Sequence, residues 1–183
     1  RPDPRARRLR QRRSNLIGLT FAVGQAFHAD LVDGVYASAE ALGYDVVLSA
    51  VTPHRDEMRA VRTLVDDRCE GLILIGPRMR AGRLGDLASG MPVVVMARRV
   101  RAVDAVRSDD VAGAVAGVEH LLGLGHRRIL YLDGGGAPGA AERLRGYRRA
   151  TGDAGLPEVV RPGGLTEREG AAAAAAMLET GDL

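Results

Sequence analysis

The sequence predicts an α/β fold built on parallel sheets. Short apolar runs recur at residues 15–22, 45–50 and 70–76, without regular alternation of apolar and polar side chains. Such runs are typical of parallel strands in a sheet that is covered on both faces. Segments with a helical period separate the runs, and this βαβαβ order takes right-handed crossovers. Ligands bind such sheets beyond the carboxyl ends of the strands, so we expect a ligand near the loop at residues 23–27.

The first helix is predicted within residues 28–44. Its apolar residues recur every three or four positions and form one stripe, which consists of Leu31, Val32, Val35, Tyr36, Ala39 and Leu42. Gly43 follows the stripe at a C′ position, where glycine commonly ends a helix. A second helical segment at 54–68 then leads to the third strand.

The same alternation continues to the end of the chain. Residues 77–90 form a polar connection with at most one short helix, and they lead to a fourth strand at 92–97 and a short fifth strand at 105–108. Asp109 and Asp110 come next, at the carboxyl end of that strand. The remaining residues predict a helix at 111–124, a strand at 127–134, a helix at 140–153, a weak strand within 156–164 and a helix that starts at Thr166.

The order of these elements indicates one complete α/β lobe and the first half of another. We place the first lobe at residues 14–126 and the second at residues 127–183, after a basic segment at residues 1–13. Thr166 and Glu169 have the spacing of a capping box, in which each side chain accepts from the other residue's backbone N–H. We therefore expect the last helix to begin at this pair.

Charge is distributed unevenly along the chain, whose formal net charge is +3. Residues 1–13 contain seven arginines and one acidic residue, Asp3, so the rest of the chain is net acidic. A basic arm with almost no apolar anchors favours a polyanion partner, nucleic acid before membrane. Asp3 and Pro4 predict a helix start, but a helix this short is unstable alone. Either the arm orders on a polyanion or it is a solvated tail.

Several function classes receive no support from the sequence. The single cysteine, Cys69, excludes a disulfide framework and favours a buried structural thiol. No run reaches the roughly 18 apolar residues of a membrane span and no signal region follows the basic arm, so we expect a cytoplasmic location without membrane contact. His120 and His126 are poorly spaced for a metal, and the loop DGGGAPG lacks phosphate-loop spacing. We expect neither a metal nor another cofactor.

The chain resembles the LacI/GalR family of bacterial transcription regulators over its whole length. RPDPRARRLRQRRSNLIGL is similar to the hinge helix and first core strand of that family, and FHADLVDGVYASAEALGYDVVLSA to its first helix and second strand. EGLILIG, SDDVAGAVAGVEHLLGLGHRRILYLDG and ERLRGYRRA follow at the family's spacings. The resemblance implies two flavodoxin-like parallel-sheet lobes, as in periplasmic sugar-binding proteins, with the second lobe incomplete here. It also implies a helix-turn-helix domain upstream.

The resemblance also implies an effector site in the cleft between the lobes. Phe27 and His28 occupy positions where family members often have an aromatic pair. Phe27 would stack on a sugar ring or a base, and His28 would donate or accept a hydrogen bond with the effector. Arg143 is the arginine of the family's R-x-x-G pattern, and its fork of donors suits sugar hydroxyls or a carboxylate. Asp109 corresponds to the acid of a D-N pair, and either binds ligand hydroxyls or caps the following helix. Asp110 replaces the asparagine of that pair.

The basic segment corresponds to the family's DNA-contacting hinge. A leucine of that hinge wedges between base steps in the minor groove and kinks the DNA. Leu9 holds this position, with Ala6 and Arg7 beside it. Asp3 replaces the family's usual asparagine, which disfavours a direct contact with phosphate at that residue.

Taken together, these features predict a homodimeric, ligand-responsive DNA-binding regulator and not an enzyme. A small-molecule effector, a sugar or a derivative, binds between the lobes and changes the affinity for operator DNA through the hinge helix. The main alternative is a solute-binding protein of a transport system, which has the same lobes but predicts an export signal or a lipid-anchor cysteine before the first strand. A third possibility, a flavodoxin-like enzyme, predicts a phosphate or catalytic loop that the sequence does not offer.

Overall fold

The computed structural model describes residues 13–164 and 166–180, which divide into two compact units. The boundary between the units falls between Val106 and Arg107. Our sequence-based boundary, after residue 126, lies later because it assigned the helix that follows Asp109 to the first lobe. In the structure this helix packs against a helix of the second unit, and we describe each unit by itself.

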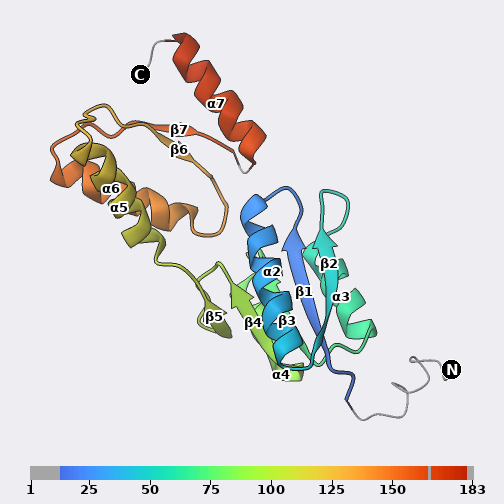
Figure 1. Ribbon diagram of the computed structural model, residues 1–183. Helices are drawn as coiled ribbons and strands as arrows, with labels where there is room; N and C mark the ends of the chain where they lie inside the picture. Colours follow the sequence, from blue (N-terminus) through green and yellow to red (C-terminus); the bar gives the residue numbers. More distant parts are fainter. Residues whose placement is uncertain (1–12, 165, 181–183) are drawn as a thin grey trace. The chain divides into compact units, whose positions relative to one another are not determined.

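The first unit is a five-stranded parallel sheet, shown in blue to green in Figure 1. Its strands are β1 (Leu16–Ala22), β2 (Asp45–Val51), β3 (Gly71–Ile75), β4 (Val93–Met96) and β5 (Asp104–Val106). They lie in the order β2-β1-β3-β4-β5, and every neighbouring pair is parallel. The α/β class and the parallel sheet predicted from the sequence are confirmed.

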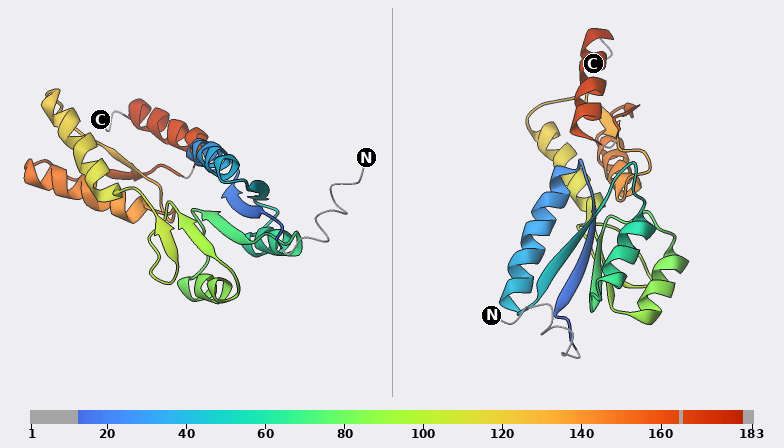
Figure 2. Two further views of the ribbon diagram at one scale, coloured as in Figure 1. Left: turned by 60° about the horizontal axis from the view of Figure 1, so that its bottom comes forward. Right: turned by 90° about the vertical axis from the view of Figure 1, so that its right-hand side faces the viewer.

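Three helices cover this sheet: α2 (Ala26–Ala41), α3 (Glu57–Asp66) and α4 (Ala81–Gly90). Figure 2 shows α3 and α4 on one face and α2 on the other. The main core lies under α3 and α4, and its fully buried members include Leu64, Leu74, Leu84 and Val95. Cys69 belongs to this core, as expected, and burial together with the charge of Asp67 raises the pKa of its thiol to about 11.

The end of α2 confirms the role predicted for Gly43. The Gly43 N–H donates to the carbonyl of Glu40 at 3.1 Å, and the Tyr44 N–H donates to the carbonyl of Ala39 at 2.9 Å. This pair of bonds is a Schellman motif, which satisfies carbonyls that the last helical turn leaves free. The chain then turns directly into β2.

The second unit contains α5 (Asp110–Gly123), β6 (Tyr131–Asp133), α6 (Ala140–Asp153), β7 (Val160–Pro162) and α7 (Glu167–Thr180). Strands β6 and β7 pair in parallel, and a small core of Val118, Ile129, Tyr147 and Ala150 forms between the helices and the strands. The capping box is confirmed, since Glu169 N–H donates to Thr166 Oγ1 at 3.3 Å and Thr166 N–H donates to Glu169 Oε2 at 2.9 Å.

Within residues 13–164 and 166–180, no helix is long and apolar enough to cross a bilayer.

Candidate functional site

A mixed donor and acceptor site forms around Arg143 in the second unit. Arg143 lies in the first turn of α6, and its Nη1 donates to Asp110 Oδ1 at 3.0 Å. Asp110 is the first residue of α5, so the ion pair joins the N-terminal turns of two neighbouring helices. The Asp110 side chain is 17% exposed and the Arg143 side chain 41% exposed. The carboxylate is therefore largely enclosed, whereas part of the guanidinium faces solvent.

Asp109 serves as the N-cap of α5. Its carboxylate accepts from the Ala112 N–H at 3.1 Å, which satisfies one of the free donors at the start of the helix. Of the two roles that the sequence left open for Asp109, the structure shows capping. A contact with ligand hydroxyls stays a prediction.

Tyr131 extends the site on strand β6. The charges of Arg143, Asp133 and Asp110 all act on its hydroxyl. Burial raises the pKa of Tyr131, and the positive charge of Arg143 opposes this rise. Its hydroxyl is therefore protonated at neutral pH, when it can both donate and accept.

A cavity of about 460 Å³ opens beside the carboxyl end of β6. Asp133 and the glycine loop at residues 134–136 line it, together with β7 and Gly164. Arg161 also contributes to the lining, and its guanidinium donates to the carbonyl of Val160 at 3.0 Å. The cavity's volume lies within the range of small-molecule pockets, and its lining offers both charges.

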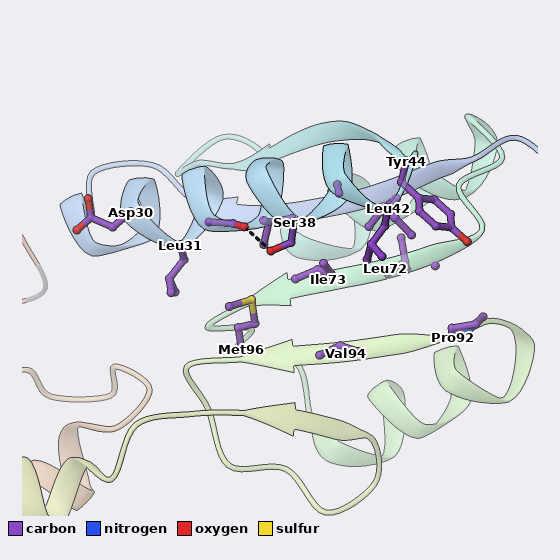
Figure 3. A pocket seen from close by; sticks show the side chains of 15 residues that line it. Asp30, Leu31, Ser38, Leu42, Tyr44, Leu72, Ile73, Pro92, Val94 and Met96 are labelled. Carbon is purple, nitrogen blue, oxygen red and sulfur yellow. Dashed lines mark hydrogen bonds between the residues drawn. The ribbon is translucent and has the colours of Figure 1, made fainter.

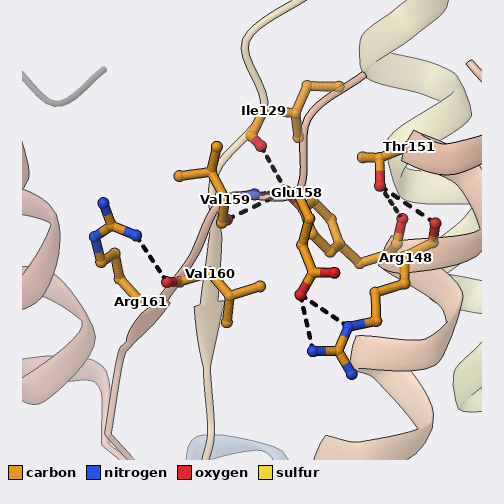
Figure 4. Close-up of polar contacts among 8 residues, drawn as sticks. Ile129, Arg148, Thr151, Glu158, Val159, Val160 and Arg161 are labelled. Carbon is orange, nitrogen blue, oxygen red and sulfur yellow. Dashed lines mark hydrogen bonds and ion pairs between the residues drawn. The ribbon is translucent and has the colours of Figure 1, made fainter. Parts of the chain in front are cut away.

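Tyr147 fixes the strands that carry these residues. It is 1% exposed, and its hydroxyl donates to the carbonyl of Ile129 and accepts from the Val159 N–H, both at 2.9 Å. Ile129 and Val159 precede β6 and β7, so one side chain of α6 sets the start of both strands. In Figure 4 the side chains of Arg148 and Glu158 meet beside this point, 2.8 Å apart. Sequence reasoning missed Tyr147, although a tyrosine on the apolar face of a helix needs a partner for its hydroxyl.

Phe27 and His28 both lie in the first turn of α2, but they differ in solvent exposure. Phe27 is 55% exposed, whereas His28 is 5% exposed. The Nδ1 atom of His28 lies 3.3 Å from the amide nitrogen of Ala22 and 3.2 Å from its carbonyl oxygen, so its tautomer decides which of them it bonds. His28 therefore holds the loop after β1, a role that the sequence analysis did not foresee. Its predicted contact with an effector is not tested by this geometry.

An apolar groove of about 550 Å³ lies beside α2 in the first unit. Figure 3 shows that Leu31 of α2 and Leu42, the C-cap of that helix, line one side, and Ile73, Val94 and Met96 of the sheet line the other. Helix α2 packs against β1 and β2 and leaves these side chains only partly covered. Such a lining suits apolar side chains better than a polyhydroxyl ligand.

The predicted DNA-contacting segment lies outside the part of the chain that the structure describes. The hinge residues Ala6, Arg7 and Leu9 fall outside the described residues. Across residues 13–164 and 166–180, no group of three or more histidine, cysteine, aspartate or glutamate side chains is arranged to hold a metal ion.

Comparison with known proteins identifies the family. Residues 20–181 match the family described as periplasmic binding proteins and sugar binding domain of LacI family. The chain belongs to this family. The LacI/GalR resemblance seen in the sequence is thereby confirmed, and the fold class with it.

Relatives of this LacI/GalR-family chain are transcriptional regulators. The HTH-type transcriptional regulator DegA of Bacillus subtilis (strain 168) is 27% identical over 165 residues, which cover 85% of this chain and 49% of DegA. The maltose regulon regulatory protein MalI of Escherichia coli (strain K12) is 30% identical over 81% of this chain and 46% of MalI. A crystal structure of a LacI transcriptional regulator from a Rhodococcus species has a TM-score of 0.84 at 47% identity, covering 90% of this chain and 63% of that one. The chain spans about half the length of these curated relatives.

Proposed function

We propose that this chain is the effector-binding core of a DNA-binding transcriptional regulator. The observation that carries the proposal is the match of residues 20–181 to the sugar-binding domain of LacI-type proteins. The site around Arg143 fits this role, because guanidinium, carboxylate and phenol groups can together satisfy a hydroxyl that both donates and accepts. The effector is a sugar or a sugar derivative, as suggested by the relative named for the maltose regulon.

In this proposal the effector acts by linkage between two sites. Binding at Arg143, with Phe27, His28 and Asp109 as further predicted contacts, changes the affinity of the protein for operator DNA. The coupling free energy between such sites is typically 1–3 kcal/mol and acts in both directions. The basic segment with Ala6, Arg7 and Leu9 would pass this effect to the DNA. The effector is bound and released unchanged, so the chain carries out no catalysis and works in the cytoplasm beside the chromosome.

We further propose that the regulator is a homodimer. Apolar side chains on the outer part of the first unit are open to solvent, among them Tyr36 on α2 at 43% exposed and Leu48 on β2 at 41% exposed. Exposed apolar residues on an edge strand and on a helix packed against it favour association with another chain. A symmetric dimer would bring two basic segments to one operator.

The transport alternative is not favoured. The relatives reported above are transcriptional regulators. No observation in the structure points specifically to transport.

The proposed function is tested with the full-length protein and genomic DNA of its source organism. Bound fragments are sequenced, and the affinity for the recovered sites is measured with a panel of neutral sugars and sugar derivatives. We expect sequence-specific binding whose affinity changes by a factor of about 5–150 with at least one compound. A protein that binds no DNA sequence specifically, with or without any of the compounds, would exclude the proposal.

A further inference from the structure

The positive charge of Arg143 is already compensated within the chain. Asp110 Oδ1 lies 3.0 Å from Arg143 Nη1, and the carboxylate is the more buried of the two groups. Asp110 occupies the position at which the D-N pattern of the family has a neutral asparagine. This replacement adds one negative charge directly beside the proposed effector-binding arginine.

Both charged groups of the pair pack against the backbone of Gly139. Gly139, the N-cap of α6, adopts a left-handed conformation with φ of 78°. A Cβ atom at this position would lie 2.6 Å from Arg143 Nη1 and 2.7 Å from Asp110 Oδ2, so both charged groups pack directly on the glycine. The N-terminal turn of α5 also favours a carboxylate at Asp110, because the helix dipole is positive there.

The other charged groups near the Arg143–Asp110 pair do not add a net positive charge to the site. Asp109, adjacent in sequence, adds a second carboxylate at the start of α5. Arg148 is engaged with Glu158. Arg161 and Asp133 line the same cavity, so their charges offset each other there. A ligand that approaches Arg143 therefore meets one accessible guanidinium and a fixed carboxylate in direct contact with it.

We propose that Asp110 is a specificity-determining residue that restricts the Arg143 site to uncharged polyhydroxyl ligands and excludes sugar acids and sugar phosphates. A hydroxyl can accept from Arg143 and donate to Asp110 at the same time. A deprotonated carboxylate, or a phosphate monoester above its second pKa, has no proton to donate and can only accept from Arg143, and it meets the like charge of Asp110 a few ångströms away. The inference rests on the proposed function, because it assumes that the effector contacts Arg143.

The test uses two anionic probes, D-glucose 6-phosphate and D-glucuronate, on the full-length protein at about pH 8, where both anionic groups have lost their protons. The midpoint of thermal unfolding is followed against probe concentration, with sodium chloride at matched ionic strength as the baseline. We expect no saturable stabilisation of the wild type. In Asp110→Asn, both probes should stabilise saturably, with apparent affinities at least about tenfold above any residual wild-type value, since the repelling charge is gone. Adding Arg143→Ala to Asp110→Asn should abolish this gain.

A matched control separates this effect from a general loss of negative charge. Asp153→Asn removes an acid from the other end of α6, where the side chain is 78% exposed and lies 3.9 Å from Arg149. It should leave the anion response unchanged. Saturable anion binding by the wild type that Arg143→Ala removes would overturn the proposal, and so would an Asp110→Asn protein that gains no anion binding. Either result leaves the regulator itself intact, which only the absence of specific DNA binding would exclude.

Discussion

At the scale of single residues, the predicted site residues Arg143 and His28, and Tyr131, which the sequence analysis did not name, are held by neighbours elsewhere in the chain. Arg143 is placed by Asp110 and Gly139. His28 is buried against Ala22. The strand that carries Tyr131 is fixed by Tyr147. The chemistry of the site therefore comes from pairs of residues and not from isolated motif positions.

The buried position of His28 predicts a pH dependence of stability. Desolvation lowers the pKa of this imidazole below its ordinary value of 6.5, and its bond to the backbone of Ala22 only partly opposes the shift. The unfolded chain then binds a proton more readily than the folded chain, so the free energy of unfolding should fall as pH decreases below about 6.5. At pH values below the pKa of His28 in the folded chain, His28 is protonated in both the folded and the unfolded chain, and the free energy of unfolding stops falling on its account.

We expect the difference in unfolding free energy between the wild type and His28→Gln to change with pH across this window. Urea unfolding at several values from about pH 8 to about pH 5 measures it, and the wild type should lose its advantage over the variant at the acid end. A difference that is constant across the whole range would show that His28 has the same pKa in the folded and unfolded chains.

At the scale of helices and strands, local signals were sufficient where local interactions decide the structure. The helix predicted at 140–153 is α6, with the same bounds, and the capping box and the Gly43 terminus also formed as predicted. The assignment of α5 to the first lobe differed from the structure, because the choice between two neighbouring units depends on packing. From the sequence, Asp110 was recognised only as a replacement for asparagine. Its ion pair with Arg143 could not be predicted, because the two residues are 33 positions apart in the chain.

The glycine of the R-x-x-G pattern, Gly146, lets α5 and α6 approach closely. A Cβ atom at Gly146 would lie 2.7 Å from the Cβ of Ala114, too close for an ordinary contact. Gly146→Ala should therefore push the helices apart and lower the free energy of unfolding by about 1–3 kcal/mol, as measured by urea unfolding. Because Asp110 and Arg143 lie on these two helices, the ion pair should be disturbed as well.

Gly152→Ala provides the matched control on the same helix. Apart from the adjacent backbone of α6, no atom lies within 4 Å of the added Cβ, so the substitution should stabilise the protein slightly, by about 0.5–1 kcal/mol, through the higher helix propensity of alanine. Equal effects of the two substitutions would mean that close packing at Gly146 contributes nothing.

At the scale of the whole molecule, the chain consists of two α/β units of a LacI/GalR-family protein. The apolar strands predicted a sheet covered on both faces, and the described residues form the main core under α3 and α4 on one face and leave an apolar groove beside α2 on the other. The chain spans about half the length of its curated relatives. The site around Arg143 lies in the second unit, and we propose that it is coupled to DNA binding.

The most direct test of this account is the sugar response of operator binding in Arg143→Ala, with Arg149→Ala as the control. Arg149 lies on the same helix, and its side chain is 70% exposed. With the sugar that changes operator affinity most, we expect Arg143→Ala to need at least about tenfold more sugar for half its effect, the loss expected for a charge-assisted hydrogen bond, and to bind the operator normally without sugar. Arg149→Ala should respond as the wild type does. An Arg143→Ala protein that responds at the wild-type sugar concentration would contradict the account.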